Sequence, residues 1–420
     1  MKWFFRKERT ANKDFQKKLS SYFDFGLLVI VALLITLGLI SIYSSTYDAG
    51  TSDFFYKQLF FSLAGFLVII IVTFLPEKLI SFNSIFIYSA SILLLIAVLF
   101  FGKTVSGTTG WFQWGPLSFQ PSELAKVTTL IMAARFLSQK GIDIQNLRDL
   151  LTVAGFFTLT VTLIILQPDM GSATVLIVLL YGILFWVGFD LFTLYFFVYI
   201  PVAIIMSLLG IWYFIGSMLF FIITNILFKK NILQTSAFIA FIFVISYFSP
   251  NIMKFMPQNT QDRIEIFINP NSDPLNKGYN VMQSVLAVGS GGVTGKGYLK
   301  GSQTQLRYIP EQRTDFIFCV PTEEFGFIGG AIVIVLYSLL VWRILKIASN
   351  TSSTFFSITS FGICTIFLYH AVVNIGMVIR IMPVMGIPLP FMSYGGSALL
   401  VNMAMIGLLM NAHRTKKKTN

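Results

Sequence analysis

Acidic residues are scarce in this chain, yet several of them fall in one short stretch. Charged residues make up 11% of the 420 residues, but PEQRTDFIFCVPTEEFGFIGG (310–330) places Asp315 at the start of an apolar run and Glu323 and Glu324 within it. A carboxylate at the mouth of a cavity can act as a general base. Asp315 could equally complement the dipole of a helix capped by Thr314. We predict that Asp315 lies at the mouth of a cavity and that Pro321 kinks the span near its start. The two glutamates are expected two to three turns inside the span, deeper in the same cavity, with a structural role.

Two other charged motifs stand at the start of apolar runs. In QPSELAK (120–126), Glu123 and Lys126 are three residues apart and share one face of a helix. Ionisable residues near an apolar run usually pair, so these two form either a functional pair or a structural clamp. In LQPDMGSA (166–173), Asp169 is expected mainly to cap the following helix.

The remaining candidates come from loops rich in aromatic, basic and small residues. SGTTGWFQWGPLSFQPSE contains Trp111, and PLPFMSYGGSALL contains Ser393 and Tyr394. GSGGVTGKG does not fit a phosphate loop, because Lys296 is followed by Gly297 rather than by Ser or Thr. No metal-ligand spacing stands out, although a divalent cation, Mg²⁺ or Mn²⁺, remains possible. The basic residues that could bind an anion, among which the sequence does not choose, are Lys126, Arg263, Arg307, Arg313 and Arg380.

The elements that position these residues are predicted to be membrane-spanning helices. Hydrophobic residues make up 55% of the chain and its mean hydropathy is +0.78, which is more apolar surface than a soluble domain needs. The apolar runs are long and continuous, unlike the short alternating strands of a membrane barrel. We therefore expect an all-α polytopic membrane protein with about twelve spans, near residues 24–45, 57–76, 84–102, 122–138, 149–167, 171–188, 190–209, 211–228, 232–249, 316–344, 354–379 and 392–412.

The positive charge indicates sidedness rather than nucleic-acid binding. The net charge is +12, and basic residues are dense in the arm 1–23 and the tail 413–420. Basic segments beside spans stay in the cytoplasm, so both termini are predicted to be cytoplasmic. The polar motifs then fall on the outer face, with a long extracytoplasmic loop at 250–313. Both cysteines, Cys319 and Cys364, lie in apolar runs, which excludes a disulfide framework.

These motifs resemble, in order and spacing, those of the SEDS family (shape, elongation, division and sporulation). The motifs are QPSELAK, QPDMG, GKGYLKGSQTQLRYIPEQRTDFIF, EEFGFIGG and PLPFMSYGGSA, and the resemblance covers almost the whole chain. The segment SQTQLRYIPEQRTDF is more similar to the elongation branch (RodA type) than to the division branch. The resemblance implies a single SEDS-type transmembrane domain, 24–412, with ten core spans. The two additional spans then form an inserted helical hairpin at 211–249.

The resemblance also implies a function at the outer face of the bacterial cytoplasmic membrane. It implies a peptidoglycan glycosyltransferase that polymerises lipid II for cell elongation, in complex with a class B penicillin-binding protein. The family's essential aspartate falls on Asp315, and its paired Glu and Lys fall on Glu123 and Lys126. Two positions depart from the family pattern: Gly110 stands where an Arg is usual, and Arg380 where a small residue is usual.

Two other functions fit many of the same features. A lipid II flippase would also have many spans, a broken helix and intramembrane charges. A non-enzymatic scaffold for a penicillin-binding protein would need the helices but not Asp315. The clustering of polar motifs on one side favours the enzyme. In that interpretation Asp315 is the catalytic base, and the substrate-binding residues are Glu123, Lys126, Trp111, Asp169, Arg263, Arg313, Ser393 and Tyr394.

Overall fold

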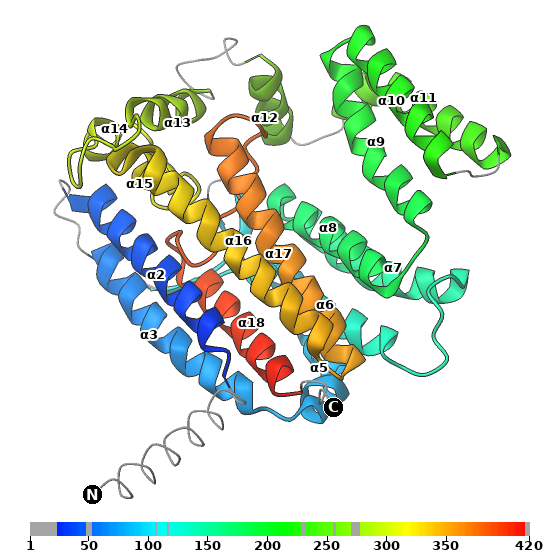
Figure 1. The fold of residues 1–420 in the computed structure, drawn as a ribbon, viewed down its shortest axis with the longest axis horizontal. Coiled ribbons are helices and arrows are strands. Elements are labelled where there is room, and N and C mark those ends of the chain that lie inside the picture. The colour runs from blue at the N-terminus through cyan, green and yellow to red at the C-terminus, as the bar shows by residue number, and fades with distance from the viewer. Residues whose placement is uncertain are drawn as a thin grey trace, which may run out of the picture.

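Long helices dominate the computed structural model (Figure 1), as the sequence predicted. The structure describes residues 23–47, 53–105, 107–115, 117–228, 232–254, 258–269 and 278–415. The predicted arm 1–23 and tail 413–420 lie mostly outside these residues. The helices are α2 (Phe25–Thr46), α3 (Asp53–Phe74), α4 (Glu77–Phe82), α5 (Ser84–Phe101), α6 (Pro121–Leu137), α7 (Leu147–Ile165), α8 (Met170–Val187), α9 (Leu191–Leu209), α10 (Ile211–Phe228), α11 (Ile232–Lys254), α12 (Gln258–Ile268), α13 (Tyr279–Ser290), α14 (Ser302–Gln305), α15 (Cys319–Glu324), α16 (Gly326–Asn350), α17 (Thr354–Val378) and α18 (Gly396–Arg414).

Within the described residues, nine helices are long and apolar enough to cross a membrane. They are α2, α3, α5, α7, α8, α9, α16, α17 and α18, and α10 and α11 carry shorter apolar stretches. The helix α6 has 17 residues and carries Glu123, Lys126 and Arg135, and most of its side chains are buried. A charged helix of this kind is stable in a membrane only where other helices surround it. The prediction of an all-α polytopic membrane protein is therefore confirmed.

The core lies around α17 and α18, the two most buried of these helices. Glycines allow the close contacts there: a Cβ on Gly407 of α18 would lie 2.7 Å from Val72 of α3, and one on Gly362 of α17 would lie 2.2 Å from Leu130 of α6. Small residues at helix crossings let backbones approach, which is how membrane helices gain packing energy. The central helices are thus held tightly enough to fix the positions of the polar residues at their ends.

The two ends of the bundle differ in character. The segments α12, α13, α14 and α15 gather at one end, and the C-terminal end of α18 lies at the other (Figure 1). At that second end, Asp24 caps α2 and forms an ion pair of 2.8 Å with Arg343 of α16. His413 of α18 lies 3.5 Å from the same carboxylate. This cluster ties three helices together far from the polar loops.

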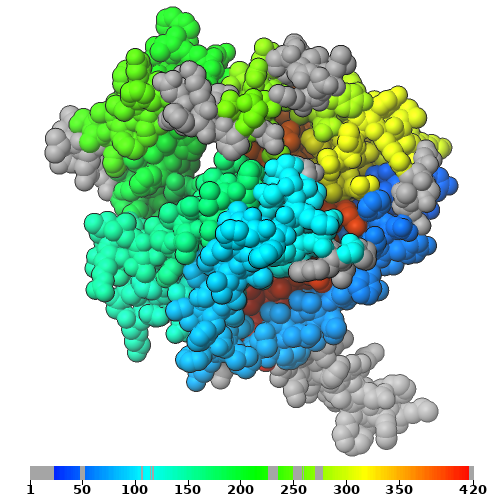
Figure 2. Space-filling view, turned by 180° about the vertical axis from the view of Figure 1, so that it is seen from behind, coloured from blue at the N-terminus to red at the C-terminus, as the bar shows by residue number. Residues whose placement is uncertain are grey.

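The segment between α5 and α6 forms a small antiparallel sheet, which the sequence analysis did not predict. Its strands are β1 (Lys103–Val105), β2 (Thr108–Trp114) and β3 (Leu117–Phe119), in the order β1-β2-β3. Lys103 pairs with Trp111, and Phe112 pairs with Phe119. Figure 2 shows this cyan segment over the bundle, with the red C-terminal part visible in a hollow between it and the blue helices. The sheet therefore forms a cover at the end of the bundle.

The span predicted at 316–344 begins later than expected. Residues up to Phe318 form turns, Cys319–Glu324 form the short helix α15, and the long helix α16 starts at Gly326. Gly326 has a φ of +66°, which only glycine adopts easily, so the chain changes direction there. Pro321 consequently lies inside α15 rather than kinking the long span. Glu323 and Glu324 precede the span instead of lying two to three turns inside it.

Candidate active site

The polar motifs surround one cavity of about 490 Å³ at the end of the bundle that carries the loops. Its walls come from the sheet, from the N-terminal ends of α6, α8 and α18, from α12, and from the loop between α17 and α18. Seven of the nine predicted site residues line this cavity, whereas Lys126 and Arg313 do not. These seven lining residues are Trp111, Glu123, Asp169, Arg263, Asp315, Ser393 and Tyr394.

Asp315 lies in a turn just before α15, not in the first turn of a long helix. Its backbone carbonyl accepts a hydrogen bond of 2.7 Å from Nδ2 of Asn374. The pKa of Asp315 is raised to about 6: burial and the negative charge of Glu311 raise it, and the positive charge of Arg263 partly opposes them. A carboxylate with this pKa is ionised at neutral pH and is a stronger base than an ordinary aspartate, which suits proton abstraction.

Arg263 reaches the same point of the cavity from α12. A methyl group built on Gly386 would lie 3.5 Å from Nη1 of Arg263 and 3.6 Å from Oδ2 of Asp315. Gly386 has a φ of +68°, so this backbone position strongly favours glycine. The guanidinium and the carboxylate therefore converge on a glycine with no side chain, which leaves room for a ligand between them and the loop.

Asp169 has the capping role that the sequence predicted. Its Oδ1 accepts a hydrogen bond of 3.0 Å from the backbone N–H of Ser172, and it caps α8. Its Oδ2 accepts hydrogen bonds from Gln120 at 3.0 Å and Ser122 at 3.2 Å. The side chain is 8% exposed and also lines the cavity. Asp169 thus joins the starts of α6 and α8 into one wall.

Glu123 and Lys126 form the predicted pair inside the bundle. Nζ of Lys126 donates to Oε1 of Glu123 at 2.8 Å, and the two residues are 3% and 5% exposed. Glu123 lines the cavity, and Lys126 lies behind it. Nζ of Lys126 is also 3.5 Å from Nε2 of His370 on α17. The pair is therefore both buried and adjacent to the cavity, so its geometry is compatible with either interpretation given above.

The polar groups of Ser393 and Arg313 are both engaged in contacts with other residues of the protein. Oγ of Ser393 donates to the carbonyl of Thr314 at 2.6 Å and accepts from the N–H of Leu389 at 2.8 Å. The guanidinium of Arg313 lies over the ring of Phe54, 3.9 Å from its centroid. Arg313 does not line the cavity, so its predicted contact with an anion is less favourable than that of Arg263. Tyr394 donates its N–H to the carbonyl of Arg313 at 2.9 Å.

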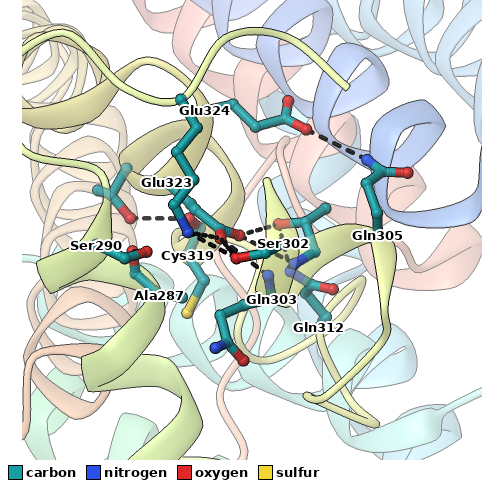
Figure 3. Close-up of polar contacts among 12 residues, drawn as sticks. Ala287, Ser290, Ser302, Gln303, Gln305, Gln312, Cys319, Glu323 and Glu324 are labelled. Atoms are coloured by element: carbon teal, nitrogen blue, oxygen red, sulfur yellow. Dashed lines mark hydrogen bonds and ion pairs between the residues drawn. The ribbon is translucent and has the colours of Figure 1, made fainter. Parts of the chain in front are cut away.

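Glu323 and Glu324 bind neighbouring segments of the chain (Figure 3), and neither of them lines the cavity. Glu323 accepts hydrogen bonds from the N–H groups of Gln303 and Thr304, both at 2.9 Å, and from Nζ of Lys296 at 2.8 Å. Glu324 accepts from Oγ of Ser44 on α2. The expected structural role agrees with this geometry, but the expected position deeper in the same cavity is wrong.

Sequence reasoning missed two buried polar residues beside the cavity, His370 and Asn374 of α17. Each is an isolated polar residue in an apolar run, and the chain has only two histidines. Such residues inside a span are usually functional or buried in protein, so this signal could have identified them. Two of the possible anion-binding residues, Arg307 and Arg380, are exposed and lie outside the cavity lining. Among the described residues, no three His, Cys, Asp or Glu side chains gather as a metal-binding group.

The fold and the cavity define a polytopic membrane protein with a polar site at one end of its helices. A family model described as "Cell cycle protein", named for FtsW, RodA and SpoVE, matches residues 25–215 and 214–418. The chain therefore belongs to the FtsW/RodA/SpoVE family, which is the family that its motifs predicted.

Named relatives and solved structures agree with this membership. Over 93% of this chain and 93% of the relative, the chain is 34% identical to the peptidoglycan glycosyltransferase MrdB of Escherichia coli (strain K12). It is 31% identical to the peptidoglycan glycosyltransferase RodA of Treponema pallidum, over 93% and 97% of the two chains. The crystal structure of the rod shape determining protein RodA of Thermus thermophilus matches with a TM-score of 0.63 and 25% identity, over 94% and 98% of the chains. A structure described as "Structural coordination of polymerization and crosslinking by a peptidoglycan synthase complex" matches with a TM-score of 0.71 and 28% identity, over 93% and 98%.

Proposed function

We propose that this chain is a peptidoglycan glycosyltransferase of the elongation type, which polymerises lipid II into glycan strands with Asp315 as its catalytic base. Relatives at 31–34% identity over nearly the whole chain carry the name peptidoglycan glycosyltransferase. The observation that carries the assignment of the base is the convergence of Asp315 and Arg263 on Gly386 within one cavity. A base beside a cation is the minimum that this transfer needs.

The reaction joins two lipid-linked saccharides. Asp315 removes the proton from the 4-hydroxyl of the acceptor sugar, and the oxygen forms a bond to the anomeric carbon of the donor. The bond between that carbon and the phosphate oxygen breaks, and the lipid pyrophosphate leaves with the electron pair. A single displacement inverts the configuration at the anomeric carbon and forms no covalent enzyme intermediate.

The leaving pyrophosphate needs positive charge more than it needs an acid. Arg263 lines the cavity and lies beside Asp315, so it is placed to meet the developing charge. Lys126 is held in the Glu123 pair and supports the wall of the cavity from behind. The lining also includes Phe61 of α3 and Leu399 of α18, which extend the cavity along apolar surface where a lipid chain fits.

The setting of this activity follows from the same proposal. The cavity faces the outer side of the cytoplasmic membrane, both termini are cytoplasmic, and residues 24–412 form one transmembrane domain with an inserted hairpin at 211–249. The partner is a class B penicillin-binding protein that crosslinks the strands. The similarity to a chain of a synthase complex that coordinates polymerisation and crosslinking supports this partner.

Polymerisation of purified lipid II by the reconstituted protein tests the proposal, with wild type compared with Asp315→Ala in the presence of the penicillin-binding partner. Glycan strands from wild type and none from the variant are expected. Equal polymer from both proteins would remove Asp315 from the mechanism. If the folded wild type makes no polymer, a lipid-flipping assay decides between the flippase and the scaffold.

A further inference from the structure

One face of α17 carries two buried polar side chains beside the cavity, His370 and Asn374. They are four residues apart, so they lie one above the other on the same side of the helix. Their exposed fractions are 3% and 0%. Neither residue lines the cavity itself. They therefore lie directly behind its wall, where they can act only through the residues that they hold.

Asn374 joins two segments of the cavity wall. Its Nδ2 donates to the carbonyl of Asp315 at 2.7 Å and to the carbonyl of Ile387 at 2.8 Å. Only the amide nitrogen can donate to carbonyls, so the two contacts fix the orientation of the side chain and use both of its hydrogens. The turn that contains Asp315 is thus fastened to the loop that contains Gly386, the point on which Asp315 and Arg263 converge.

His370 joins the same loop to the buried pair on α6. Its Nδ1 lies 3.1 Å from the carbonyl of Pro388, which can only accept, so Nδ1 carries the hydrogen. Nε2 is then a lone-pair acceptor, and it faces Nζ of Lys126 at 3.5 Å. The ammonium of Lys126 is therefore held between two acceptors, Nε2 of His370 and Oε1 of Glu123 at 2.8 Å.

We propose that His370 and Asn374 are positioning residues that set the catalytic aspartate, the Gly386 loop and the Glu123–Lys126 pair in one fixed arrangement. This inference rests on the proposed function. A base that must reach a hydroxyl works only within hydrogen-bond distance, and a displacement of about 1 Å can cost roughly a hundredfold in rate. The two contacts made by Asn374 control that distance directly.

The chain offers a matched control for Asn374. Nδ2 of Asn411 on α18 donates to the carbonyls of Val72 and Leu75 at 3.2 and 2.6 Å, and the residue is 4% exposed. Asn411 therefore makes the same pair of buried contacts away from the cavity lining. Asn374→Leu and Asn411→Leu each remove two donors at similar side-chain size, so both lower thermal stability. Only Asn374→Leu is expected to lower kcat for lipid II polymerisation, by about a hundredfold with KM within threefold.

His370 is tested by a conservative and a disruptive change. Gln has both a donor and an acceptor, so His370→Gln can keep the contacts with Pro388 and Lys126 and is expected to retain kcat/KM within about threefold. His370→Leu removes both contacts and is expected to lower kcat/KM about tenfold. In a Lys126→Ala background, His370→Leu should cause a smaller further loss, because only the contact with Pro388 is then left to remove.

Amide hydrogen exchange measures how firmly the Asp315 turn and the Gly386 loop are held, and it needs no lipid II. Faster exchange in 311–318 and 384–392 is expected in Asn374→Leu but not in Asn411→Leu. The inference is overturned if kcat and exchange in the Asn374→Leu protein match those of the Asn411→Leu protein. It is also overturned if the kcat/KM of the His370→Leu protein equals that of the His370→Gln protein. A wild type that makes no polymer would contradict the proposed function, while the exchange comparison would still decide whether Asn374 positions the Asp315 turn.

Discussion

Asp315 experiences charges of both signs, and its pKa reports their balance. Burial and the nearby Glu311 raise the pKa and Arg263 lowers it, and the balance of these effects is a pKa of about 6. If the ionised carboxylate is the base, the rate of polymerisation rises with pH through about 6 and is constant above that value. The pH profile of kcat/KM measures this rise in the free enzyme, and the rising part of the profile is its acid limb.

The neighbours of Asp315 give this prediction its controls. Glu311→Gln removes a negative charge and is expected to move the limb to lower pH, and Arg263→Ala is expected to move it to higher pH. Glu265→Gln, on the exposed side of α12, should leave the limb unchanged. A limb that does not move in either Glu311→Gln or Arg263→Ala would mean that another group titrates.

The arginines between α11 and α15 differ in position, although their sequence contexts looked equivalent. Arg263 lines the cavity, whereas Arg307 is exposed outside it. Arg263→Ala is expected to lower kcat/KM for lipid II by about ten- to a hundredfold, because a charge-assisted contact with the pyrophosphate is lost. Arg307→Ala is the matched control and should change kcat/KM less than twofold. Equal losses in both variants would assign the pyrophosphate to a different site.

At the scale of elements, hydrophobic pattern predicted the helices well and the connections poorly. Each expected span corresponds to a helix because a membrane requires long apolar runs, and such runs are visible in a sequence. The sheet at 103–119 was missed because β1 and β3 span only three residues each, and the seven residues of β2, TTGWFQW, do not alternate between polar and apolar side chains. The start of α16 was misplaced because residues 316–320 are apolar for a different reason: they are buried in protein.

The candidate site was predictable in composition but not in geometry. Motif residues such as Glu123, Asp169 and Asp315 do gather at one cavity, because helix starts with the same orientation meet at the same end of the bundle. The sequence could not distinguish Arg263 from Arg313, since that depends on whether Phe54 takes the guanidinium. It also could not show that Asn374 contacts Asp315, because 59 residues separate them.

The loop between α13 and α15 is fastened by Glu323. Burial tends to raise the pKa of this carboxyl, but its hydrogen bonds with Lys296, Gln303 and Thr304 outweigh burial and lower it. Glu323→Gln replaces an acceptor oxygen by an amide that opposes two N–H donors. It is expected to cost about 3 kcal/mol of stability and to expose the 296–305 segment to proteases.

Limited proteolysis and thermal unfolding measure the two effects of Glu323→Gln. Because the pKa is lowered in the folded state, the contribution of Glu323 is present above about pH 4.3 and is lost as the pH falls through the lower folded value. Wild type and variant should therefore converge in stability in acid. Glu265→Gln is the control. A variant as resistant to proteases as wild type at neutral pH would show that the backbone contacts of the glycine run 289–297 hold the loop without the Glu323 side chain.

Backbone contacts of the glycine run also hold the loop between α13 and α15. The N–H of Lys296 donates to the carbonyl of Glu323 at 3.0 Å, and the N–H of Gly297 donates to that of Glu324 at 2.9 Å. A Cβ on Gly295 would lie 2.0 Å from the carbonyl oxygen of Glu324. The glycine run therefore exists to let this loop lie against the α15–α16 junction, which explains why it does not fit a phosphate loop.

At the scale of the whole molecule, α9, α10 and α11 form a unit of their own beside the bundle (Figure 1). Their buried side chains make a separate apolar cluster that includes Phe196, Tyr199, Phe221 and Ile242, distinct from the main core. The main core includes residues of α2, α3, α5, α6, α7, α8, α16, α17 and α18, and from the described residues of α9, α10 and α11 only Leu194, near the start of α9. The cavity is lined without any residue of α9, α10 or α11 among those described. The catalytic bundle and this unit are thus separable by their packing.

Deleting residues 211–249 and joining Gly210 to Pro250 tests that separation. Two spans are removed together, so the loop that carries Arg263 stays on the same side of the membrane. The face of α9 that α10 and α11 cover would contact lipid, which is as apolar as the helices it replaces, so little stability should be lost. We expect a folded protein with kcat/KM for lipid II within about threefold of wild type. Deleting α7 and α8 together also preserves sidedness but removes Asp169 and a wall of the cavity, and should abolish activity. If the 211–249 deletion also abolished activity in a folded protein, the hairpin would be part of the catalytic unit.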